Sequence, residues 1–219
     1  MVAVKDIFKR PEKFRLNHVI LIIIMAEFIM TTASGLITPL FSLFLVDDIG
    51  ASVTVVGFSF AIYWVVKSVL QLPVARYLDK NHGEIDDYYS MLMGLFLTTT
   101  AVYLFYFVHA VWQIYLLQFL IAVGDAFIVP PFYAIFTRHL DKNQEAFEWS
   151  LRSSFSLGAG SAFGGALSGI LAAAVGIRPV FLVNGTLMFI GTVILLFLRP
   201  YIRPRVPQSL AQFYEQKKA

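Results

Sequence analysis

Three charged side chains stand out deep inside long apolar segments of the chain, where charged residues are rare. They are Glu27, Lys67 and Asp125, in the first, second and fourth of six such segments. A charge within a membrane-spanning helix is costly, and it usually serves a substrate, an ion or a proton pathway. We therefore expect the two carboxylates to bind a proton or a cationic or neutral solute. The alternative is that Lys67 only neutralises Glu27 or Asp125 inside a packed interior.

Other polar side chains recur beside these charges at helical spacing. Their spacing places each set on one face of its helix. A polar face is a poor surface for lipid, so we expect these faces to line an interior site. The candidate binding residues are Glu27, Thr31, Ser34, Tyr63, Lys67, Gln118 and Asp125.

The composition is that of a membrane protein. Of the 219 residues, 58% are hydrophobic and only 14% are charged, which is too few for the surface of a soluble domain. The chain has no cysteine, and its four histidines are scattered without metal-ligand spacing. No phosphate-binding or nucleophile motif is present. We therefore expect no enzyme activity, no cofactor and no metal site.

Six apolar segments are each about long enough to cross a bilayer as a helix. Helices are expected because lipid-exposed strand edges would leave backbone groups unpaired. The predicted organisation is an all-α membrane domain at 17–199, between cytoplasmic segments at 1–16 and 200–219. The apolar segments are 17–45, 53–75, 88–108, 111–136, 151–175 and 179–198.

The basic residues indicate the orientation. Of 17 Lys and Arg residues, 14 lie in residues 1–16, in the tail from Arg199 onward and in the loops 76–87 and 137–150, all on one side of a six-span topology. The positive-inside rule places that side, with both termini, in the cytoplasm of a cell inner or plasma membrane. The net charge of +3 reflects this face, so membrane lipid is expected as a partner and nucleic acid is not.

The loop between the second and third segments carries Asp79 and Lys80, followed by Gly83. It resembles the signature loop of the major facilitator superfamily, in which an aspartate and a basic residue precede a glycine. The run Gly160-Ser-Ala-Phe-Gly164-Gly165 is similar to a glycine-rich pattern in the fifth span of that family, with Ser161 in place of a proline.

This resemblance implies one six-helix half of the family fold, built from two inverted three-helix repeats. It also implies a secondary active transporter of a small solute that works by alternating access and is coupled to protons. Two copies of a six-span chain share one orientation, so a homodimer would supply both halves. The alternatives are a second half-transporter as partner, a truncated transporter, or an accessory or structural membrane protein that transports nothing.

The resemblance also implies a gate. Asp79, Lys80 and Gly83 would close the cytoplasmic side against the fifth span of the partner, where Arg152 could bind Asp79. The glycines of that span form two small-xxx-small pairs, which let helices approach closely. The expected packing residues are Gly160, Gly164, Gly165 and Gly169.

Overall fold

The computed structural model describes residues 16–80 and 83–204, and every regular element in these ranges is helical. The predicted cytoplasmic segments 1–16 and 200–219 lie largely outside the described residues. Within the described residues, six helical spans are long and apolar enough to cross a membrane. The elements in order are α2 (His18–Leu43), η1 (Phe44–Asp48), α3 (Val53–Asp79), α4 (Ile85–Leu104), η2 (Phe105–Phe107), α5 (Val111–Arg138), α6 (Glu145–Leu151), η3 (Arg152–Ala159), α7 (Gly160–Val175), α8 (Ile177–Leu196) and η4 (Arg199–Tyr201).

The fifth span differs most from its apolar segment. It begins at Glu145, ahead of the predicted start at 151, and α6, η3 and α7 run on as one helix. Glu145 and Glu148 are polar, but a carboxylate in the first turn is favoured by the helix dipole. Hydropathy therefore placed the start of this span too late.

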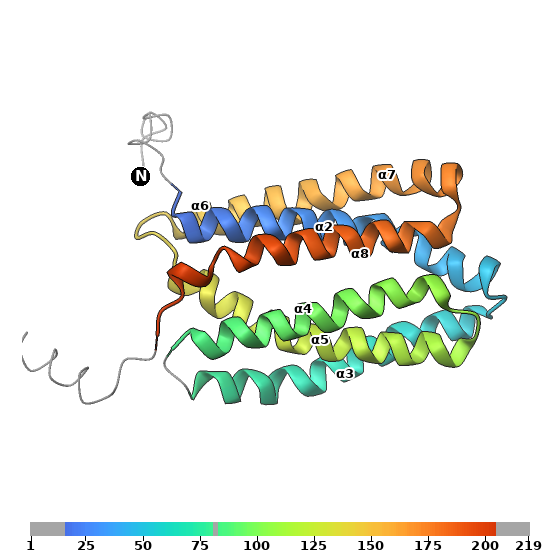
Figure 1. Cartoon of the computed structure of the whole chain (residues 1–219), viewed down its shortest axis with the longest axis horizontal. Coiled ribbons are helices and arrows are strands. Elements are labelled where there is room, and N and C mark those ends of the chain that lie inside the picture. The colour runs from blue at the N-terminus through green and yellow to red at the C-terminus, as the bar shows by residue number, and fades with distance from the viewer. Residues whose placement is uncertain (1–15, 81–82, 205–219) are drawn as a thin grey trace, which may run out of the picture.

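The spans form two layers of three (Figure 1). In one layer α2 lies between α7 and α8, and in the other α5 lies between α3 and α4. The helices α4 and α8 join the layers, whereas α2 and α5 barely touch each other. The pairing α2–α7 corresponds to α5–α3, and α2–α8 corresponds to α5–α4. This is the arrangement of two inverted repeats, α2–α3–α4 and α5–α7–α8.

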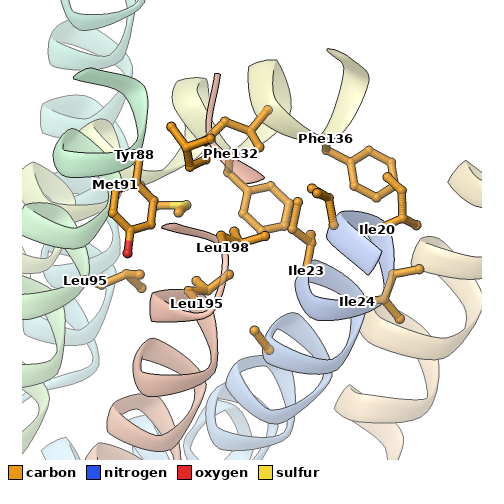
Figure 2. Packing of buried hydrophobic residues seen from close by; sticks show 14 residues of the cluster. Ile20, Ile23, Ile24, Tyr88, Met91, Leu95, Phe132, Phe136, Leu195 and Leu198 are labelled. Carbon is orange, nitrogen blue, oxygen red and sulfur yellow. The ribbon is translucent and has the colours of Figure 1, made fainter. Parts of the chain in front are cut away.

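An apolar core holds the layers together at the end where both termini of the described chain lie (Figure 2). Isoleucines of α2, among them Ile20 and Ile23, meet Phe132 of α5, Met91 of α4 and Leu195 of α8. A second core at the opposite end is aromatic, with the rings of Phe105 and Phe181 stacked 5.2 Å apart. Phe41, Phe105 and Phe181 of this second core also line a cavity between the layers.

Polar contacts also tie the helix ends together. At the terminal end, the backbone N–H of Glu84 donates to the carbonyl of Arg203, and the N–H of Arg203 donates to the Glu84 carboxylate, each at 3.0 Å. At the other end, Arg178 pairs with Asp48 at 3.1 Å and donates to the carbonyl of Val108 at 2.7 Å. Each of these contacts joins the start or end of different spans, so the bundle is closed at both ends.

Small residues of the fifth span form a stripe along α2. Ser156 donates to the carbonyl of Ile24, and Ser168 donates to the carbonyl of Leu36. Between them, a Cβ on Gly164 would collide with the carbonyl oxygen of Thr32. The stripe comprises Arg152, Ser156, Gly160, Gly164 and Ser168, every fourth residue, and all five are buried. The first part of this stripe lies in η3, which has the wider turn of a π-helix.

We expect Gly164→Ala to lower the free energy of unfolding by about 1–3 kcal/mol, because α7 must move away from α2 to admit the methyl group. The neighbouring substitution Gly165→Ala is the matched control, since an added Cβ there meets no atom within 4 Å. Thermal unfolding of both variants in detergent would test this. Equal losses at the two positions would contradict close packing at Gly164.

Candidate binding site

A hydrogen-bonded cluster joins α3 to α5 near the middle of both spans. The Tyr63 hydroxyl donates to Oδ2 of Asp125 at 2.5 Å, and Nζ of Lys67 donates to the Tyr63 hydroxyl at 2.9 Å. The Lys67 Nζ also lies 3.4 Å from the same Asp125 oxygen. Tyr63 and Lys67 are four residues apart on α3, so they present one face to α5. The cluster thus pairs one carboxylate with one ammonium through a shared phenol.

Asp125 and Tyr63 also line a cavity of about 320 Å³ between the two layers. All three helices of the α3–α4–α5 layer contribute to its wall, together with α2 and α8 of the other layer. Most of the wall is apolar or aromatic. Its polar residues other than Asp125 and Tyr63 are Ser34, Thr38, Thr98, Gln118 and Asn184. This combination of apolar walls and a few polar groups is usual for small-molecule sites.

A second ion pair lies in the other layer. The Arg152 guanidinium donates to Oε1 of Glu27 at 2.5 Å, and both residues are buried. Four rings surround the guanidinium at 5.0–5.7 Å from its carbon, those of Phe132, Tyr133, Phe136 and Trp149. The ring faces favour the cation. The Glu27 side chain is 11% exposed and is not in the cavity wall, whereas the Asp125 side chain is 23% exposed and lines the cavity. We therefore call Glu27–Arg152 the sealed pair and Lys67–Asp125 the accessible pair.

The two ion pairs join equivalent pairs of helices in the inverted repeats. Glu27 lies on the first helix of one repeat and Asp125 on the first helix of the other. Each carboxylate binds a base on the second span of the opposite repeat, Arg152 or Lys67. The two repeats therefore contain corresponding ion pairs, of which Glu27–Arg152 is sealed and Lys67–Asp125 is accessible.

The structure separates the residues that the sequence grouped together. Tyr63, Asp125, Ser34 and Gln118 line one cavity, and Lys67 binds Asp125 from behind the wall. The remaining two candidates lie elsewhere: Glu27 is in the sealed pair, and Thr31 lies against Gly160, whose added Cβ would be 3.1 Å from the Thr31 Cβ.

Two wall residues were missed by sequence reasoning. Thr98 and Asn184 are each 4% exposed, and the Thr98 hydroxyl and the Asn184 amide oxygen have no hydrogen-bond partner within the described residues. Asn184 is a lone amide in an apolar segment, which is a signal that could have identified it. Thr98 sits in a run of three threonines, so its side chain could not be singled out by type. In the described ranges no group of three His, Asp or Glu residues could hold a metal ion.

With this geometry established, residues 23–217 match the family model of the Major Facilitator Superfamily. The chain belongs to this superfamily. Among solved structures, its fold is similar to the in meso crystal structure of the POT family transporter PepTSo, with a TM-score of 0.67 and 20% sequence identity. The match covers 89% of this chain and 40% of that chain, so our chain spans less than half of the transporter's length. The comparison with curated proteins gives no match.

The loop that resembles the family's signature loop follows α3. Asp79 and Lys80 are exposed, whereas Gly83, with which the described chain resumes after residues 81–82, is buried. Arg152, the expected partner of Asp79 in a second copy, binds Glu27 of its own chain. Of the four packing glycines, Gly160 and Gly164 face α2, whereas Gly165 and Gly169 are exposed and an added Cβ would meet no atom within 4 Å.

We expect Glu27→Gln to lower the free energy of unfolding by about 3–5 kcal/mol, because it leaves the Arg152 guanidinium buried without a carboxylate. Arg152→Met should cost a similar amount. The double variant should lose clearly less than the two single losses added together, since neither charge is then left alone. Denaturant unfolding of the four proteins in detergent measures this coupling. Strictly additive losses would show that the pair does not act as a unit.

Proposed function

We propose that this chain is a secondary active transporter of a small solute that works by alternating access. The observation that carries the proposal is the Tyr63–Lys67–Asp125 cluster, which lies near the middle of two spans and on the wall of a cavity. A paired carboxylate open to a cavity inside a membrane span is suited to binding an ion or a solute. Membership of the superfamily supports transport as the class of activity.

We further propose that protons drive the transport and that Asp125 carries the coupling proton. The carboxylate holds Lys67 and Tyr63 when it is ionised, and a proton on it would weaken both contacts. Glu27 is a weaker candidate for this role because its charge is held by Arg152 in a closed aromatic cage. We assign to the Glu27–Arg152 pair the structural task of joining α2 to the fifth span.

The functional unit we propose is a homodimer. In the second and fifth spans, 11% and 17% of the most apolar window is buried, compared with 39–50% in the other four spans. The exposed face of α7 carries Gly165 and Gly169, which would allow a neighbouring helix to approach closely. A second copy with the same orientation would cover both spans and complete the cavity. A different six-helix unit in place of the second copy is the alternative.

We propose that Asp79 and Lys80 form a gate on the cytoplasmic side. The distribution of basic residues predicts that this is the side on which both termini lie. Asp79 is exposed at the end of α3, where it could meet the start of α6 in a second copy. The free N–H groups of a helix start attract a carboxylate. Arg152 would act on this gate through Glu27, by fixing the position of the fifth span.

A non-transporting membrane protein is the second candidate. The sealed Glu27–Arg152 pair favours it, because that pair does only what a structural ion pair would do. The two functions differ in what Asp125 must do. A structural protein would tolerate loss of its charge provided that the fold survived.

We expect Asp125→Asn to abolish proton movement coupled to solute, because the amide cannot exchange a proton with the cavity. Proteoliposomes that contain a pH-sensitive dye would be tested with a panel of neutral and charged small organic solutes. Asp47→Asn is the matched control, since Asp47 is exposed at the far end of the first span. Solute-driven proton flux that survives in Asp125→Asn would refute the assignment. Absence of solute-driven flux in the natural protein would favour the structural alternative.

We expect cysteines at Phe58 and Ala166 to form disulfides between protomers, because the chain has no natural cysteine and both positions are exposed on the open spans. Crosslinking in lipid nanodiscs, read as a doubled mass on a denaturing gel, would measure this. The control pair is Phe96 with Val193, which are exposed on α4 and α8, outside the proposed interface. Crosslinks at the control pair alone, or a monomeric mass in nanodiscs, would contradict the homodimer.

A further inference from the structure

The cavity wall carries one ionisable carboxyl group and no cationic side chain. Asp125 is in the wall, whereas Lys67 binds it from outside the wall. The other basic side chain buried between these spans, Arg152, is held by Glu27 in the separate aromatic cage. A ligand that enters the cavity therefore meets negative charge before it meets positive charge.

The surroundings of the Lys67 ammonium are themselves a recognition site for a cation. Its Nζ lies 5.2 Å from the ring centres of both Tyr63 and Trp64. It also lies 3.4 Å from the Asp125 carboxylate. Aromatic faces together with a carboxylate are how proteins bind organic ammonium groups.

The same groups face the cavity. Tyr63, Trp64 and Asp125 all line it, while the lysine that they hold does not. The Lys67 and Tyr63 contacts both fall on Oδ2 of Asp125, and within the described residues Oδ1 accepts no hydrogen bond. An ammonium group in the cavity would thus meet the same carboxylate and the same two rings that hold Lys67.

The rest of the cavity suits an apolar body with a neutral polar group. Phe41, Phe60, Phe105 and Phe181 give it aromatic walls. The Thr98 hydroxyl and the Asn184 amide oxygen reach the wall from α4 and α8, both buried and without a hydrogen-bond partner in the described residues. Buried polar atoms without a partner are costly, so a ligand that bonds to them gains affinity. A volume of about 320 Å³ is at the small end of ligand sites.

We propose that the cavity binds small organic amines in their cationic form, and that Lys67 is a tethered competitor for the same carboxylate. The entering ammonium takes Asp125 and the rings of Tyr63 and Trp64, and Lys67 is released. When the ligand leaves, Lys67 returns, so the carboxylate is not left unpaired inside the membrane span. This inference names the substrate class of the proposed transporter and rests on that proposal for its biological meaning. The binding step itself does not require transport.

The test is a binding series with one apolar body and three charges, measured on purified protein in detergent at pH 8. The probes are 2-phenylethylamine, 2-phenylethanol and 3-phenylpropanoate, and the readouts are calorimetry and tryptophan fluorescence, compared between the natural protein and a Trp64→Phe variant. We expect the amine to bind more tightly than the alcohol and the carboxylate not to bind. This order is expected because the Asp125 carboxylate in the cavity wall attracts the ammonium probe and repels the carboxylate probe.

Two substitutions then distinguish the role of Lys67, the proposed competitor, from that of Asp125, the proposed binding carboxylate. Lys67→Met should tighten amine binding about tenfold, because the carboxylate loses its resident cation. Asp125→Asn should weaken amine binding about tenfold or more and leave the alcohol unchanged. Lys142→Met is the matched control, since it removes an exposed lysine from the loop between α5 and α6, away from the cavity wall. Lys67→Gln, which keeps a polar head, provides a second variant if the methionine destabilises the fold.

Three results would overturn the proposal. One is a carboxylate probe that binds more tightly than the amine. Another is weaker amine binding in both Lys67 variants, which would make the lysine a ligand contact and not a competitor. The third is no amine binding by the natural protein or by either Lys67 variant. Amine binding without any transport in proteoliposomes would uphold this inference and refute the proposed transporter, so the two can fail separately.

Discussion

The need to pair every charge within the membrane spans governs the arrangement of this protein. An isolated ion in the apolar interior is too costly to keep, so each carboxylate is held by a base on a neighbouring helix. Glu27 holds the fifth span against α2 through Arg152, and Asp125 holds α3 against α5 through Lys67. The inverted repeats place both pairs between equivalent helices. The two pairs differ in access, because aromatic rings close one and a cavity opens beside the other.

The fold could be predicted from the sequence because its main determinants are local. A run of about twenty apolar residues is enough to specify a span. The site could be predicted only in part. Spacing placed Tyr63 with Lys67 on one face of α3, and that pairing depends on a single helix. Spacing could not show that Glu27 meets Arg152, which is distant in the chain and is surrounded by rings of α5 and of its own span.

The polar stripe of the first span illustrates this limit. Glu27, Thr31 and Ser34 share a face by helical spacing, yet each meets a different neighbour. The helix α2 has 26 residues, so it is about 39 Å long and passes several partners in turn. A shared face therefore does not imply a shared site. The position of a side chain along the helix decides which neighbouring residue it contacts. Tertiary packing determines which residue lies beside each position.

The π-helix in the fifth span has a consequence for the phase of its buried stripe. In an α-helix, four residues advance 40° beyond a full turn, so five residues at that spacing would spread over about 160°. A π-helix of about 4.4 residues per turn falls short of a full turn by about 30° over the same four residues. In η3 and α7 together these two angular deviations have opposite signs and largely cancel. Arg152, Gly164 and Ser168 therefore all contact α2. If η3 were wound as an α-helix, α7 could keep its contact with α2 only by turning Arg152 away from Glu27.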